Sequence, residues 1–380
     1  SASVSSSSST SVPIVPSLLA ALAGVGTVSG VAAVVESASS VPAFRPDGQQ
    51  FSQETFGGRF ARMLLACDPR LLLYSEAHIR QCQELLKSHA YLSENSSSSS
   101  SSPQRNGGGS TSSRDSSLWE AKRIVDTAVH PDTGELIPRP FRMSGYVPYN
   151  GPICVAMVAA QSTPTLLFWS WVNQSQNALV NYYNRNASSP MTNETLLKSY
   201  AVAVGSALTV AFGLATFISK RYSAAQAKTM LRWVSFPSAV VASSLNCYIV
   251  RSPEIQTGVP LMDAKNRIVA DGQTSVEAAK RGVYATTTSR ALLQAPVYFL
   301  PPLLMSMGPL QRLVSKNKRW TVPLTTYLLL VSFGVGLPAA VAVFPQISEI
   351  SVHNVENKFQ HLRDPETQKT YEVFYYNKGL

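Results

Sequence analysis

The chain has 380 residues, of which 45% are hydrophobic and only 14% are charged, and its formal net charge is +10. An average soluble domain carries about 25% charged residues, so this composition argues against an ordinary soluble enzyme and favours a membrane protein with polar extensions. The basic residues stand between apolar runs rather than in one stripe, which is typical of membrane flanks and argues against nucleic acid as a partner.

Residues 1–40 form a Ser-, Ala- and Gly-rich extension. Residues 12–35 carry no charge and are long enough to cross a bilayer, although they are only weakly hydrophobic. They are therefore either an additional membrane segment or an apolar part of a soluble extension, and the sequence leaves both interpretations open.

Residues 41–146 are predicted to be a soluble, mainly helical region. Ser75 can cap a helix whose apolar residues repeat at helical spacing. A Ser- and Gly-rich stretch at 93–117 predicts a flexible insertion, and Ser117 with Glu120 forms a capping box that would begin a second helix.

A sharp turn is predicted directly after this second helix. Proline ends a helix, and Gly reaches positive φ without steric cost, so the segment favours a rigid structural turn over a catalytic His–Asp pair. The residues of this motif are His130, Pro131, Asp132, Thr133 and Gly134.

Five apolar segments predict an all-α, polytopic membrane domain over residues 147–344. Each approaches the length of about 20 residues that spans a bilayer, and Pro or Gly interrupts several of them. Such breaks either expose helix ends to a substrate or reflect the general frequency of Gly and Pro in membrane helices. The predicted spans are Val147–Trp171, Tyr200–Ser219, Trp233–Val250, Ala291–Leu310 and Thr321–Phe344.

A row of amides follows the first apolar run. Asn173, Asn177, Asn181 and Asn184 recur at spacings of four, four and three residues and share one face of a helix. Because unpartnered amides are costly in hydrocarbon, the row predicts either a polar substrate path or hydrogen bonds between helices. A path would be completed by amides of other segments, and the candidates are Asn246, Gln161 and Gln294.

Smaller elements are expected around the last spans. The segment turning at Asp263–Asn266 predicts a hairpin, and Thr274 with Glu277 predicts the start of an amphipathic helix. Residues 345–380 are predicted to be a soluble tail, with an amphipathic helix over 352–362 and a strand-like end.

No chemistry-bearing constellation emerges elsewhere. The four cysteines form no CxxC and the five histidines no HxxxH, so we expect no metal, no cofactor and no disulfide framework. No nucleophile with a general base is apparent either, so the chain is not predicted to be an enzyme.

Several short motifs, in consistent order from about Phe51 to the end, resemble the sideroflexin family of mitochondrial inner-membrane proteins. They are Asp68-Pro69-Arg70, His130–Glu135, Arg142-Met143-Ser144, Thr163-Pro164, Phe168–Asn186, Asn246-Cys247, Gly258-Val259-Pro260, Asp263, Ser289-Arg290, Ala295-Pro296, Pro301-Pro302, Phe344-Pro345-Gln346 and Asn377–Leu380. The chain departs from the family at Ala160-Gln161-Ser162, where relatives commonly carry Tyr-Arg-Thr, and in its first 40 residues.

The resemblance implies a multi-pass transporter of serine or related small neutral amino acids in the mitochondrial inner membrane, supporting one-carbon metabolism. Its partners would be the lipid bilayer, the amino-acid substrate, and inner-membrane proteins or further copies of the chain. A non-transporting scaffold or assembly subunit of an inner-membrane complex is the alternative, because an intramembrane cation is missing at Gln161.

Overall fold

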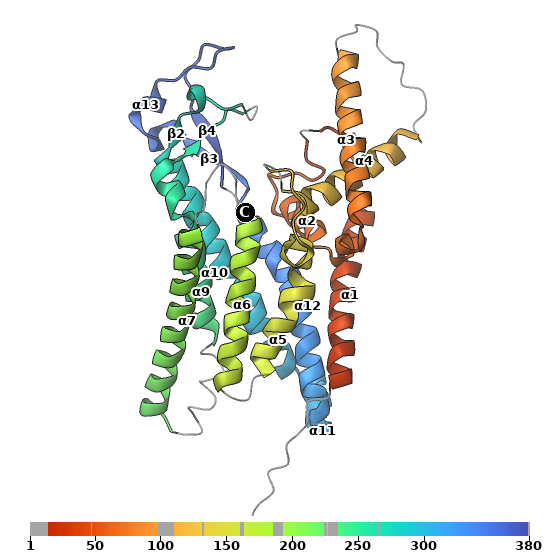
Figure 1. Ribbon diagram of the computed structural model, residues 1–380, viewed down its shortest axis with the longest axis vertical. Helices are drawn as coiled ribbons and strands as arrows, with labels where there is room; N and C mark the ends of the chain where they lie inside the picture. The colour runs from red at the N-terminus through yellow and green to blue at the C-terminus, as the bar shows by residue number, and fades with distance from the viewer. Residues whose placement is uncertain are drawn as a thin grey trace, which may run out of the picture.

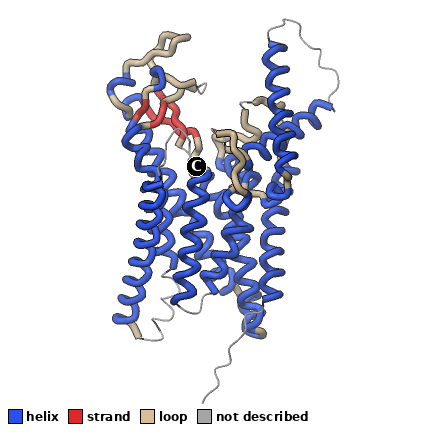
Figure 2. Tube along the Cα trace, in the orientation of Figure 1, coloured by secondary structure: helices blue, strands red, loops and turns tan. Residues whose placement is uncertain are grey.

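The computed structural model describes residues 14–46, 48–97, 110–130, 133–159, 163–184, 193–223, 226, 235–264 and 267–378. Long helices run side by side as a bundle, and two small sheets lie at one end of it (Figures 1 and 2). Among the described residues, three helices are long and apolar enough to cross a membrane, or four if the bent pair α10 and α11 forms one span. The predicted helical membrane fold is thus confirmed, whereas a count of five spans stays a prediction.

The first half of the chain supplies one long helix, a region of helices packed at one end of the bundle and a second set of long helices (Figure 1). Their bounds are α1 Ile14–Ala38, α2 Phe56–Ala66, η1 Pro69–Leu73, α3 Glu76–Ser97, α4 Ser110–Ala128, η2 Arg139–Phe141, η3 Met143–Gly145, η4 Tyr146–Asn150, α5 Gly151–Ala159, α6 Thr163–Tyr183 and α7 Asn193–Arg221.

The second half supplies the remaining long helices and both sheets. Antiparallel β1 and β2 pair Val259 with Ser275, and antiparallel β3 and β4 pair Ile347 with Asn377. The bounds are α9 Ser235–Thr257, β1 Val259–Pro260, η5 Ala270–Gly272, β2 Thr274–Ser275, α10 Val276–Ser306, α11 Gly308–Lys316, η6 Lys318–Trp320, α12 Thr321–Ala342, β3 Ile347–Ser351, η7 Val352–Asn354, α13 Asn357–Gln360 and β4 Val373–Asn377.

Helix α12 is the centre of the bundle. It packs on α10, α1 and α2, and 56% of its most apolar stretch is buried, against 17% for α1 and 7% for α7. Leu330, Phe333 and Leu337 of α12 meet Leu293 and Val297 of α10 in the main hydrophobic core. Helices α1 and α7 consequently lie at opposite edges of the bundle (Figure 1).

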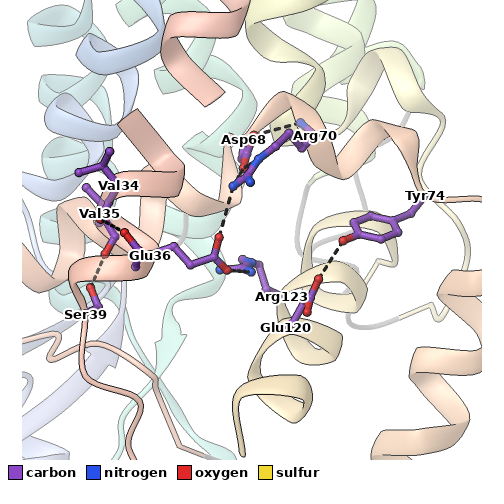
Figure 3. A network of polar contacts seen from close by, with 10 residues as sticks. Val34, Val35, Glu36, Ser39, Asp68, Arg70, Tyr74, Glu120 and Arg123 are labelled. Atoms are coloured by element: carbon purple, nitrogen blue, oxygen red, sulfur yellow. Dashed lines mark hydrogen bonds and ion pairs between the residues drawn. The ribbon is translucent and has the colours of Figure 1, made fainter. Parts of the chain in front are cut away.

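Helix α1, which contains the ambiguous residues 12–35 from Ile14 onward, is docked along α12. Val28 lies directly over Gly334, and the Thr27 and Tyr327 hydroxyls are 3.2 Å apart. The end of α1 is held by Glu36, which pairs with Arg70 and Arg123 (Figure 3). The apolar segment is therefore part of the helical bundle.

The first predicted span is the main correction to the expected topology. Residues 147–171 are divided between η4, α5 and α6 instead of forming one helix. Helices α5 and α6 pack on each other in opposite directions (Figure 1). Cys154 of α5 lies 4.0 Å from Asn173 of α6, and the Pro140 carbonyl, before α5, accepts a hydrogen bond from Gln176 of α6. Helix α5 has 9 residues, about 14 Å, which is too short to span, and Pro164 lies in the first turn of the returning helix α6.

Other local expectations had mixed outcomes. Ser75 does cap α3, the hairpin around Asp263 is present, and the tail ends in strand β4. However, the predicted flexible insertion is partly helical, since α3 continues to Ser97 and α4 begins at Ser110. Ser117 therefore lies inside α4 instead of capping it, and its hydroxyl donates to the Ser113 carbonyl.

The predicted helix at 352–362 is also wrong. Instead of a continuous helix, η7 and the four-residue α13 place Val352, Val355 and Phe359 in a core with Phe374 of β4. This core needs an irregular backbone because the chain must wrap around the β3–β4 hairpin. Ser275, rather than Thr274, is the cap of α10, because its side chain accepts from the Ala278 amide, whereas the Thr274 hydroxyl donates to the Thr257 carbonyl.

Candidate functional site

Four elements meet around Tyr146 inside the bundle. Its ring stacks on Phe333 of α12 with centroids 4.5 Å apart, and its hydroxyl interacts with the Asn150 side chain one turn later. Cys154 of α5 and Arg290 of α10 lie within electrostatic range of that hydroxyl. The polar groups of η4, α5 and α10 therefore converge against an aromatic wall supplied by α12.

Arg290 is the charged member of this cluster. It lies midway along α10, is half-buried, and is followed by no charged residue until Arg312. Within the described residues, no carboxylate pairs with its guanidinium. An unpaired cation inside a helical bundle is costly unless an anion or water meets it, so Arg290 is a candidate for binding a substrate carboxylate.

Three amide oxygens in the bundle lack hydrogen-bond partners among the described residues. They are Oδ1 of Asn150, Oε1 of Gln174 and Oδ1 of Asn246, and all three side chains are buried. Most buried polar atoms in proteins are hydrogen-bonded, so each of these oxygens is available to accept a hydrogen bond from water or a ligand. A carbonyl oxygen accepts from N–H or O–H groups, which matches the ammonium or hydroxyl end of a small amino acid.

The amide row on α6 serves two different purposes along its length. Near its start, Asn173 Oδ1 lies 4.0 Å from the Cys154 sulfur and so borders the Tyr146 cluster. At its end, Asn184 Nδ2 donates to the Phe141 carbonyl at 2.8 Å, and the neighbouring Gln176 donates to Pro140 at 2.7 Å. The far end of the row thus holds the η2 segment against α6, as the packing interpretation expects.

Among the described residues, no side-chain hydrogen bond joins the predicted path residues of other helices, Asn246 and Gln294, to α6. Asn246 is buried on α9, and Gln294 lies on α10 with its amide donating to the Arg290 carbonyl at 3.3 Å. Asn177 is half-buried on α6. Gln161 and the side chain of Asn181 lie outside the described residues. The substrate path drawn from these six amides stays a prediction.

The His130 motif folds as a tight turn. The His130 amide donates to Glu135 at 2.8 Å, the Gly134 amide donates to His130 at 2.9 Å, and Gly134 has φ +70. Nδ1 of His130 accepts from the Thr133 amide at 3.3 Å, so this nitrogen is used inside the turn. Pro131 and Asp132 lie outside the described residues, but the geometry at His130, Thr133 and Gly134 is that of a structural turn.

Further cations line the end of the bundle nearest the carboxyl terminus. Arg59 donates to the Ala342 carbonyl at 2.8 Å and Lys378 to the Phe344 carbonyl at 2.9 Å, which satisfies carbonyls at the end of α12. Arg251, which pairs with Glu254, also lies near Lys378. Arg290 lies in range of Lys378 as well, so several cations gather near this end of the bundle, of which Arg251 is paired with Glu254.

Sequence reasoning missed the two residues at the heart of this cluster. Arg290 was noticed only as part of a family motif, and the signal that could have singled it out is its place at the start of an uncharged run. Tyr146 carried no signal at all, because its role depends on the stacking partner Phe333 from a distant helix. Among the described residues, no group of three or more His, Cys, Asp or Glu side chains could hold a metal.

Comparison with known proteins identifies related sequences. A family model described as Sideroflexins matches residues 45–380. Sideroflexin-5 of Rattus norvegicus is 32% identical over 345 residues, covering 90% of this chain and 94% of that protein. Sideroflexin-5 of Caenorhabditis elegans is 36% identical, with 89% and 96% covered, and Sideroflexin-3 of Homo sapiens is 32% identical, with 87% and 96% covered. No solved structure matches the chain.

Proposed function

The chain belongs to the sideroflexin family, and from this membership we propose that it transports serine or related small neutral amino acids across the mitochondrial inner membrane. Transport would supply one-carbon metabolism with serine. The long apolar helices α1, α7 and α12, together with the bent α10–α11 pair, provide the membrane-crossing part of such a protein.

The observation that carries the proposal is the unpaired Arg290 beside Tyr146 inside the bundle. A zwitterionic amino acid needs a cation for its carboxylate and acceptors for its ammonium group. Arg290 provides the first, with hydrogen bonds to a charged group worth about 1.5–3 kcal/mol each. The orphan oxygen of Asn150, adjacent to Tyr146, provides one of the acceptors.

Cations at one end of the bundle support an approach route for this substrate. Arg59 and Lys378 lie at that end without a paired carboxylate among the described residues, and their field would concentrate molecules bearing a carboxylate before they reach Arg290. The cation that relatives carry near position 161 is replaced here by Gln161. In this chain, Arg290 would therefore carry the charge that holds the carboxylate.

The test is serine uptake into proteoliposomes that contain the purified chain or its Arg290→Gln variant. Losing one charge-assisted contact should raise the Km for serine about ten- to hundredfold, since each decade corresponds to about 1.4 kcal/mol. Arg290→Lys should recover part of this loss because it keeps the charge but not the bidentate geometry.

A matched control is Arg281→Gln. Arg281 lies on the same helix but is exposed, so its loss should leave the Km within about twofold. Arg290→Gln protein that inserts normally and transports serine with an unchanged Km would refute the role of Arg290. A wild-type chain that takes up no amino acid would refute the transporter itself.

The alternative is a scaffold or assembly subunit, and one feature favours it. Helices α3 and α4 pair with each other and extend beyond the bundle (Figure 1). Stoichiometric co-purification with an inner-membrane complex that is lost on deleting residues 76–128, without any serine uptake by the intact chain, would support this reading.

A further inference from the structure

Helix α7 presents most of its surface to the outside of the molecule. It packs on α9 and α6 along one side, and only 7% of its apolar stretch Tyr200–Arg221 is buried. Phe212 and Phe217 are 50% and 60% exposed on the open side. In a membrane-spanning bundle, this open side faces lipid or another protein.

A shallow groove of about 720 Å³ runs along the open side of α7. Gly213 contributes no side chain to the groove, and a Cβ added there would have no heavy atom within 4 Å. From Thr209 to Arg221 the groove covers about 18 Å at 1.5 Å per residue, close to one leaflet of a bilayer whose core is about 30 Å thick. Its lining residues are Thr209, Phe212, Gly213, Thr216, Phe217, Lys220 and Arg221.

Two cations lie at one end of this groove. Lys220 and Arg221 form the last turn of α7, both are exposed, and neither pairs with a carboxylate within the described part of the chain. Over the rest of its length the groove is mainly apolar, with Thr209 and Thr216 as its polar residues. A molecule that fits must therefore combine a hydrocarbon chain about one leaflet long with a negative group at its end.

We propose that the groove on α7 binds an anionic phospholipid. Its acyl chain lies along Gly213 between Phe212 and Phe217, and its headgroup phosphate contacts Lys220 and Arg221. Basic residues near a membrane surface each contribute about 1 kcal/mol to the binding of anionic lipid, so the pair supplies a preference of about thirtyfold over a variant without them.

A second copy of the chain fits this surface less well. Two copies that share a membrane orientation and pack α7 on α7 around a twofold axis would face Lys220 and Arg221 of one copy with the same residues of the other. Four cations would then meet without a counter-ion. An anionic headgroup neutralises the pair instead.

The experiment is native mass spectrometry of the detergent-purified chain titrated with phosphatidylglycerol or with phosphatidylcholine of identical acyl chains. Wild-type protein should retain phosphatidylglycerol more strongly, and Lys220→Gln/Arg221→Gln should weaken that retention about thirtyfold. The matched control Lys318→Gln/Arg319→Gln removes two exposed cations from the same end of the bundle (Figure 1) and should change it less than threefold.

A separate variant tests the groove itself. Gly213→Leu fills the groove without changing charge, and because Gly213 faces open space the fold should tolerate it. This variant should also lose bound phosphatidylglycerol. Equal retention of the two lipids by wild-type protein, or unchanged retention in both α7 variants, would overturn the proposal. So would displacement of the lipid by inorganic phosphate alone, or a dimeric mass that Gly213→Leu abolishes.

Discussion

Lys378 is a cation held inside the protein where the tail meets the bundle. Only 3% of its surface is exposed, and its Nζ donates to the Phe344 carbonyl at 2.9 Å. Burial, and after it the positive charges of Arg251, Arg59 and Arg290, lower the pKa of Lys378 from its ordinary value to about 8. The charge of this side chain is therefore sensitive to mildly alkaline pH.

The lowered pKa predicts how stability depends on pH. An unfolded chain keeps this proton up to about pH 10.4, whereas the folded protein releases it near 8. Between these values the unfolded state binds more protons, so the free energy of unfolding should rise with pH by at most about 1.4 kcal/mol per unit. Below pH 8 both states are protonated and the contribution is constant.

The measurement is the thermal midpoint of wild type and Lys378→Met in one detergent from pH 7 to 10. Above pH 8, the thermal midpoint of wild type should rise relative to that of Lys378→Met. The midpoint of Lys87→Met, which changes an exposed lysine, should follow that of wild type at every pH. Parallel curves for wild type and Lys378→Met would show that the pKa of Lys378 is ordinary.

Single residues also show where sequence reasoning stops. The polar character of Asn173 and Asn184 was visible, but one borders the Tyr146 cluster and the other holds the η2 segment. Spacing alone cannot separate these roles, because both residues share one helical face. Which partner reaches each amide depends on how α5 and α6 pack on each other, and the spacing of amides within one helix does not encode that packing.

At the scale of elements, the α1–α12 contact depends on the absence of a side chain. A Cβ at Gly334 would lie 2.4 Å from Cγ2 of Val28, so Gly334→Ala should push the helices apart. Overpacking of this kind typically costs about 1–3 kcal/mol. The thermal midpoint should fall, and adding Val28→Ala should restore part of the loss by removing the clashing methyl groups.

A control on the same interface helix is Gly26→Ala. No heavy atom lies within 4 Å of a Cβ at Gly26, so this change should not lower the midpoint. A Gly334→Ala protein as stable as wild type would mean that α1 is not held against α12.

Elements with strong local signals were predictable and those with tertiary causes were not. The Ser75 cap, the hairpin at Asp263 and strand β4 follow from local chemistry and are present. The predicted helix at 352–362 has helical spacing, yet its apolar residues fill a core against β4. Tertiary burial decided the backbone there, because that segment must pack on a partner far away in the chain.

At the scale of the whole molecule, the regions predicted to lie outside the membrane gather at one end of the bundle. Helices α3 and α4 and the β3–β4 hairpin all lie toward the end that also holds the described carboxyl-terminal residues (Figure 1). An odd number of crossings between residues 147 and 344, as the sequence suggested, would separate them. The antiparallel return of α6 along α5 explains the difference, since it reverses the chain where one continuous span was expected.

This arrangement predicts the result of accessibility labelling. Cysteines introduced at the exposed Ser116 of α4 and Glu366 near β4 should react with a membrane-impermeant maleimide from the same side. A cysteine at the exposed Arg319, before α12, should react only from the opposite side, because α12 carries the chain from there to the β3–β4 end (Figure 1). The four native cysteines are buried or half-buried, and the unmodified chain gives their background. Labelling of Ser116→Cys and Glu366→Cys from opposite sides would mean that the chain crosses the membrane an odd number of times between these positions, with α5 and α6 in a single span.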